Sequence, residues 1–207
     1  MKIYLNLRTV AISLGMAAFF LLTNFSGIQA QNIIKVKTDG QAYVDYTSHS
    51  TWVDATSDLQ AAIDGLAANG GGEIWVAGGT YYPSTHFSAD PQVEDNLGEN
   101  PPEQYRSFVV QNGVTILGGF VGTETDLSER PDDPIEAGSA TTLSGDIGVT
   151  DDISDNSFHV VIFPLGTDDS AVLDGLIITK GNANDGTTFN GRGGGIHARN
   201  GGLARNC

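Results

Sequence analysis

Cysteine is almost absent from this chain. Among its 207 residues there is a single one, Cys207, at the last position of the sequence. One cysteine excludes any disulfide bond within these residues. If the protein is exported to an oxidising compartment, its fold must therefore be held together by hydrophobic burial and backbone pairing.

Positive charge is also scarce. Lys and Arg together number 10 against 25 Asp and Glu, which gives a formal net charge of −15 at pH 7. Such a surface repels the phosphates of nucleic acids and the head groups of anionic lipids, so we expect no nucleic-acid partner. The same surplus of carboxylates suits Ca²⁺, a hard cation that prefers oxygen ligands.

Helical periodicity is confined to one segment, residues 57–68. Its apolar residues recur at the i, i+3, i+4 and i+7 positions typical of an amphipathic helix. These residues are Leu59, Ala62, Ile63 and Leu66. Ser57 and Gln60 form a capping-box pattern at the start, and the glycines at 70–72 favour an end to the helix. We expect no further helix along the chain.

The first 30 residues predict a secretory signal peptide. They contain two basic residues, Lys2 and Arg8, then an uncharged apolar run and small residues before Gln31. The apolar run is shorter than a membrane span of roughly 20 residues, which makes a permanent anchor the less favoured interpretation. Removal of this segment leaves 8 basic and 25 acidic residues, a formal net charge of −17.

The remainder is long enough for one domain with a core of its own. We expect residues 31–82 to form an N-terminal cap made of a strand, the helix and a first coil strand. Residues 83–106 contain several prolines and acidic residues and predict a protruding polar loop. Residues 107–207 are expected to form stacked coils that are truncated at the C-terminal end.

Glycine is abundant, with 27 residues that often lie in pairs or triples between short β-branched runs. Two runs of seven residues, Val110–Ile116 and Val172–Ile178, share one pattern. Each has a hydrophobic residue at its first position, glycine at the fourth, a hydrophobic residue at the fifth and isoleucine at the seventh. We interpret their separation as three coils of about 20 residues each, as in solenoid proteins. A bend at Asp174 and Gly175 would allow the apolar residues on both sides of it to face one core. The pattern predicts parallel sheets built from successive coils.

Several motifs also carry a family resemblance. The most specific are "LGGFVGTET", "LSGDIG" and "GGGI". Over residues 33–207 the chain resembles the right-handed parallel β-helix proteins of Gram-negative cell surfaces, which have a pectin-lyase-like fold and polymorphic outer-membrane-protein repeats. Residues 193–196 are similar to the GGA-I motif of that repeat, and residues 203–206 are a weaker version of its F-x-x-N motif.

The resemblance implies an all-β fold, a right-handed parallel β-helix (solenoid) with an N-terminal amphipathic capping helix. It also implies that the sequence is the N-terminal fragment of a longer protein. Association with the outer membrane would then depend on a C-terminal region beyond residue 207.

One acidic loop is a candidate calcium site. Four aspartates lie within ten residues of one another: Asp146, Asp151, Asp152 and Asp155. Carboxylates and backbone carbonyls are the ligands that Ca²⁺ prefers, although the spacing is not that of an EF-hand. A solvated loop that adds to solubility is the alternative interpretation. We expect no other cofactor.

Three tyrosines near the polar loop, Tyr81, Tyr82 and Tyr105, are candidates for stacking on sugar rings; packing over the edge of the core is the alternative. We predict no catalytic residue in these 207 residues. Asp151 and Asp152 are adjacent, so on a strand they would point to opposite faces, whereas a glycosidase needs two carboxyl groups that face each other across the sugar.

These observations predict an exported protein at the cell surface or outside the cell. Its lateral loops would serve adhesion or glycan contact, with surface glycans or host or cell-surface proteins as partners and without catalysis in this segment. The alternative is a polysaccharide lyase or glycoside hydrolase whose catalytic coils lie beyond residue 207. A structural stalk is a third possibility. The adhesive role rests on fold-level analogy.

Overall fold

The computed structural model describes residues 32–87, 101–136, 138–184, 186 and 190–207. The chain divides into two compact units, Met1–Ala30 and Gln31–Cys207, and the described residues belong to the second. The predicted signal peptide, residues 1–30, lies outside the described residues, as do residues 88–100 of the predicted polar loop. Both assignments therefore stay predictions.

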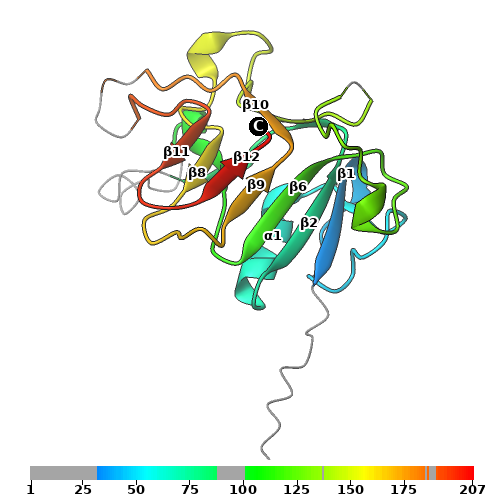
Figure 1. Cartoon of the computed structure of the whole chain (residues 1–207). Coiled ribbons are helices and arrows are strands. Elements are labelled where there is room, and N and C mark those ends of the chain that lie inside the picture. The colour runs from blue at the N-terminus through cyan, green and yellow to red at the C-terminus, as the bar shows by residue number, and fades with distance from the viewer. Residues whose placement is uncertain (1–31, 88–100, 137, 185, 187–189) are drawn as a thin grey trace, which may run out of the picture. The chain divides into compact units, whose positions relative to one another are not determined.

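The described strands form three sheets (Figure 1). The first sheet has the order β1 (Ile33–Gln41), β2 (Gly72–Ala77), β6 (Val114–Phe120), β9 (Val172–Asp174) and β12 (Leu203–Arg205). The second has the order β10 (Leu176–Thr179), β7 (Thr141–Ser144) and β3 (Gly79–Tyr81). The third has the order β11 (Ile196–Ala198), β8 (Val161–Phe163), β5 (Arg106–Val109) and β4 (Thr85–His86). All described pairs are parallel except β4 with β5.

The predicted helix is present as α1 (Leu59–Ala68). Its N-cap is Asp58 rather than the predicted Ser57, because the Asp58 Oδ1 atom accepts a hydrogen bond of 2.9 Å from the backbone N–H of Ala61. The helix ends at Asn69 and Gly70, where Gly70 has a φ of 90°. Within the described residues, three short 3₁₀ helices lie in the connections: η1 (Glu103–Tyr105), η2 (Leu127–Glu129) and η3 (Ile153–Asp155).

The main core joins α1 and one face of the first sheet with buried residues of the other two sheets, such as Leu143 and Phe163. The apolar stripe of the helix packs in the same cluster as a row of residues that are in register across four neighbouring strands. This row consists of Ile34, Ile74, Ile116 and Leu173, all with no exposed surface. Each such side chain contributes roughly 1.5–3 kcal/mol through burial, so the row and the helix stabilise each other.

The other face of the first sheet carries a second apolar cluster. Alternate strand residues point to opposite faces, and Trp75, Leu117 and Phe120 form this cluster together with Trp52. The Phe120 ring stacks on the Trp75 ring with centroids 4.8 Å apart. The sequence motif "LGGFVGTET" therefore has a packing role that the sequence did not reveal.

Lys35 crosses this second cluster. Its ammonium lies 5.0 Å from the ring centroid of Trp52 and 4.9 Å from that of Trp75, and it donates a hydrogen bond of 2.8 Å to the backbone carbonyl of Glu124. The indole N–H of Trp52 donates to the same carbonyl at 2.8 Å. Burial lowers the pKa of Lys35, although nearby carboxylates, first among them Glu124, oppose the shift. These bonds fasten the segment after β6 over the sheet.

The predicted fold class is wrong. The described residues have mixed strand and helix content, with three sheets of parallel strands and one α-helix, rather than an all-β right-handed parallel β-helix. They also contain one antiparallel pair, β4 with β5. Strands of the first sheet begin at residues 33, 72, 114, 172 and 203, so their spacing is unequal and does not match the predicted 20-residue coil.

The sequence repeat that suggested regular coils does not correspond to a structural repeat. Val114 and Ile116 lie in β6 of the first sheet, whereas Leu176 and Ile178 lie in β10 of the second. The bend predicted at Asp174 and Gly175 is present, with a φ of 69° at Gly175, and it separates β9 from β10. The two runs look alike because each combines a glycine turn with buried aliphatic residues, although they lie in different sheets.

Candidate functional site

Two clefts lie along α1. The larger, which we call the amide cleft, has a volume of about 570 Å³. It is lined by Gln60, Asp64, Ala67, Thr85, Phe87, Val109, Gln111, Asn112, Pro164, Leu165, Gly166 and Thr167. A volume of this size is within the range of small-molecule sites. Among the described residues that line it, Asp64 is the only one with a formal charge.

Gln60 fixes the helix side of the amide cleft. It is buried, its Oε1 atom accepts a bond of 2.8 Å from the backbone N–H of Val109, and its Nε2 atom donates to the Val109 carbonyl at 3.1 Å. The Nε2 atom of Gln60 also donates a hydrogen bond of 2.9 Å to Asp64, which lies one helical turn later on the same face of α1. The side chain thus joins α1 to the end of β5, a role different from the capping box predicted for it.

Asp64 is held by two amides and still offers an acceptor. Its Oδ1 atom receives hydrogen bonds from Gln60 at 2.9 Å and from Gln111 at 2.7 Å. Within the described residues, the other oxygen, Oδ2, has no hydrogen-bond partner. The carboxylate is therefore oriented in advance, with one oxygen open to a donor from outside.

The opposite edge of the cleft is a turn that Asn112 holds. Its Nδ2 atom donates to the Gly166 carbonyl at 3.1 Å, and its Oδ1 atom accepts from the Asp168 N–H at 2.8 Å. Hydrogen bonds from Ser170 lower the pKa of Asp168, so this carboxylate also orders the turn. The turn presents Leu165, whose side chain is 65% exposed, as an apolar surface of the cleft.

The second cleft, which we call the tyrosine cleft, has a volume of about 350 Å³. It is lined by Thr38, Ser57, Asp58, Leu59, Gln60, Thr80, Tyr81, Tyr82, Ser84 and Phe108. Gln60 is common to both clefts. Hydroxyl groups dominate the polar lining of this second cleft, and Tyr82 adds an aromatic ring that is 54% exposed.

The three tyrosines predicted to contact glycans do not come together. Tyr81 is buried, and its hydroxyl donates a bond of 2.9 Å to the Ala77 carbonyl; burial raises its pKa. Tyr105 packs edge-on against Phe158 with centroids 5.2 Å apart, outside the lining of both clefts. Of the three, Tyr82 alone offers an exposed ring to one of the two clefts. The sequence could not separate it from Tyr81, because the two are adjacent and the end of β3 at Tyr81 is not marked in the sequence.

The four predicted calcium ligands have protein partners. The ammonium of Lys180 lies 2.7 Å from Asp146 Oδ2 and 2.6 Å from Asp151 Oδ1. Asp152 caps η3 through bonds from the N–H and hydroxyl of Ser154, and Asp155 Oδ2 accepts from the Val149 N–H at 2.7 Å. Within the described ranges, no three His, Cys, Asp or Glu side chains are grouped so that they could hold a metal ion. Calcium binding stays a prediction, and Lys180 is a competing cation.

Replacement of Lys180 by Met tests this competition. We expect Lys180→Met to lower the melting temperature, because Asp146 and Asp151 then lack their shared positive charge. Millimolar Ca²⁺ should raise the melting temperature of this variant more than that of the unchanged protein. Lys37→Met, at another lysine with a nearby aspartate, is the control. An equal rise in the unchanged protein and in Lys180→Met would instead favour a calcium site that tolerates Lys180, and no rise in either protein would favour the solvated loop.

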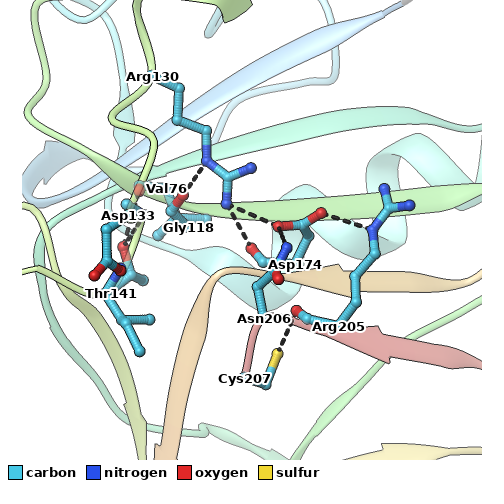
Figure 2. A network of polar contacts seen from close by, with 11 residues as sticks. Val76, Gly118, Arg130, Asp133, Thr141, Asp174, Arg205, Asn206 and Cys207 are labelled. Atoms are coloured by element: carbon cyan, nitrogen blue, oxygen red, sulfur yellow. Dashed lines mark hydrogen bonds and ion pairs between the residues drawn. The ribbon is translucent and has the colours of Figure 1, made fainter.

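A third cleft, of about 450 Å³, lies on the outer face of the first sheet and contains an ion-pair network (Figure 2). Asp174 accepts from Arg130 at 3.1 Å, from the Nε atom of Arg205 at 2.6 Å and from Asn206 at 3.2 Å. Arg130 also donates to the carbonyl of Gly118 at 2.7 Å. The network joins the loop after η2 to β6, β9 and β12, so we assign it a structural role. Sequence reasoning missed it because its side chains are far apart in sequence, with 76 positions between Arg130 and Asn206.

Comparisons of this chain with known proteins found no match. No protein-family model matches the chain, and no curated protein and no solved structure matches it either. The resemblance drawn from the sequence motifs therefore stays a prediction. In the described part of the chain there is also no helix with the length and apolar character needed to span a bilayer.

Proposed function

We propose that this chain is an exported protein that binds neutral glycans in the amide cleft, without chemical conversion of the ligand. The observation that carries the proposal is Asp64: its carboxylate is oriented by two amide groups and keeps one oxygen open within a cleft of about 570 Å³. An open carboxylate oxygen favours a ligand that donates hydrogen bonds, and sugar hydroxyls are such donors.

The apolar part of the cleft supports the same ligand class. A sugar ring presents hydroxyl groups at its rim and C–H bonds on its faces. Phe87, Pro164 and Leu165 offer apolar surface for those faces, while Gln111 offers its amide to the rim. Because its polar groups are few and fixed and its wall is apolar, the cleft favours one orientation of a bound sugar over others.

Charge favours a neutral ligand over an acidic one. The described lining of the amide cleft contains one carboxylate and neither Lys nor Arg. The chain as a whole carries a formal charge of −15. A polyanion such as a pectic acid would therefore meet repulsion both at the cleft and over the surface, whereas an uncharged polysaccharide would not.

Calorimetric titration with two sets of oligosaccharides tests the proposal. We expect neutral oligosaccharides to bind and acidic ones to bind at least tenfold more weakly. Asp64→Ala should weaken the binding of the neutral ligand about tenfold or more, since hydrogen bonds to charged groups contribute about 1.5–3 kcal/mol. The control is Asp132→Ala, which removes an exposed carboxylate that lines the third cleft instead.

Three outcomes would contradict the proposal: no binding of any neutral glycan, preferential binding of acidic glycans, or equal affinities for Asp64→Ala and the unchanged protein. The titrated mixtures should also be analysed for new reducing ends and for unsaturated products. Turnover of the ligand would replace the proposal with the alternative, a polysaccharide lyase or glycoside hydrolase.

A further inference from the structure

We infer that the tyrosine cleft is a second glycan subsite, continuous with the amide cleft, so that the protein takes an oligosaccharide laid along α1 with Tyr82 stacked on one of its rings. This inference rests on the proposed function of the amide cleft. It adds the size of the ligand, its direction along the helix and the residue that binds its distal end.

The first reason is that the same three segments line both clefts, and α1 lines them one after the other. On α1 and its cap, residues 57–60 line the tyrosine cleft and residues 60–67 line the amide cleft. On the segment after β3, residues up to Ser84 line the former, and Thr85 and Phe87 line the latter. On β5, Phe108 lines the former and Val109 the latter. The two clefts therefore follow one another along the helix.

Gln60 marks the junction. It lines both clefts, and its side chain is pinned to the backbone of Val109 by two hydrogen bonds. A buried side chain that is already bonded at both of its polar atoms forms a fixed floor between the clefts. The lining positions from Asp58 to Ala67 span about 14 Å at a rise of 1.5 Å per residue, which is longer than one sugar ring.

The second reason is the chemistry of the tyrosine cleft. Thr38, Thr80 and Ser84 are exposed and bring hydroxyl groups, while Tyr82 brings a ring that is 54% exposed. Asp58 already caps the N-terminus of α1, so that helix end is not what the cleft offers to a ligand. The lining has no Lys or Arg among its described residues, which matches the uncharged ligand proposed for the amide cleft.

A series of neutral oligosaccharides of one linkage and increasing length tests the inference. We expect affinity to rise with length until both clefts are filled. Tyr82→Ala should weaken the binding of the longest member about fivefold to tenfold and leave the binding of the disaccharide unchanged, because the short ligand fits in the amide cleft alone. Tyr82→Phe keeps the ring and should bind the long ligand like the unchanged protein.

Val53→Ala, at a residue that is 85% exposed and lines neither cleft, is the matched control. If short and long ligands bind equally well and Tyr82→Ala changes neither affinity, the second subsite is refuted while the amide cleft stands. If Asp64→Ala leaves binding unchanged but Tyr82→Ala abolishes it, the amide cleft is refuted as the primary site and the order of subsites with it. If no neutral glycan binds the unchanged protein, both proposals fail together.

Discussion

Replacement of Phe120 by Ala should lower the free energy of unfolding by about 3–5 kcal/mol, the range for removing a large aromatic side chain from a core. Phe120 has no exposed surface and lies between Trp52, Trp75 and the guanidinium of Arg130, whose centre is 5.7 Å from the ring centroid. The cluster is backed by the rigid first sheet, so it has little freedom to collapse into the cavity left by the ring.

Urea or guanidinium titration, with the fluorescence of the two tryptophans as the signal, measures this effect. Both tryptophans contact Phe120, so their emission in the folded state should also change in Phe120→Ala. Val121→Ala, at the next residue, is 60% exposed and should change stability by less than about 0.5 kcal/mol. A loss below about 1 kcal/mol in Phe120→Ala would show that the second cluster does not pack as described.

Replacement of Asp174 by Asn should lower stability by about 3 kcal/mol at neutral pH, because it leaves the Arg130 charge without its partner in a poorly solvated place. The side chains of Asp174 and Arg130 are 9% and 13% exposed. Arg205→Ala should cost less than about 1 kcal/mol, since the Arg205 side chain is 54% exposed and its ion pair is screened by water. Asp169→Asn, which makes the same charge change at an exposed residue, is the control.

The pH dependence of this difference provides a second measurement. Burial by itself raises the pKa of Asp174, but hydrogen bonds from Asn206 and Arg130 outweigh it and leave the pKa below its ordinary value. The stabilisation from a carboxyl group with a lowered pKa is present above its unfolded value, roughly 3.9, and is lost as the pH falls through the folded value. The stability difference between Asp174→Asn and the unchanged protein should therefore shrink in acid. A difference that grows below pH 4 would contradict the ion-pair assignment.

Local patterns in the sequence were informative wherever one face of an element is buried. The helix at 59–68 was visible because its four apolar residues recur with the helical period, and the structure buries all of them. In β2 the alternation of Ile74 and Val76 with Glu73 and Trp75 also separates the two faces of the strand correctly. Trp75, however, is not solvent-facing, since the Phe120 ring stacks on it and Trp52 packs in the same cluster.

Sheet membership was not visible in the same way. The runs at Val110–Ile116 and Val172–Ile178 look alike in sequence, yet the glycine turn of the first leads into β6 and that of the second separates β9 from β10. Which strand pairs with which depends on the length and conformation of the connections between them, and these are irregular here. A repeat length inferred from two similar runs therefore gave a regular solenoid that the structure does not contain.

The candidate sites show the same contrast between residues that are close in sequence and residues that only the fold brings together. Aspartates within ten residues were easy to notice, but their partner Lys180 lies 29 positions after Asp151. No sequence pattern linked Asp64, Gln111 and Leu165 as parts of one cleft, because they come from a helix and two separate turns. Tyr82 was noticed for its ring, and only the fold distinguished it from the buried Tyr81.

Composition and short-range periodicity were enough to establish the excess of negative charge, the lack of internal disulfides, the helix at 59–68 and the alternation of buried and exposed residues in the strands. These properties follow from composition or from periods of two to four residues, which each segment carries regardless of its neighbours. The sheet that each strand joins, the cation that pairs with Asp146 and the residues that line the clefts along α1 became visible in the folded chain alone. Those outcomes depend on contacts between segments tens of residues apart, where burial of all segments together selects one arrangement.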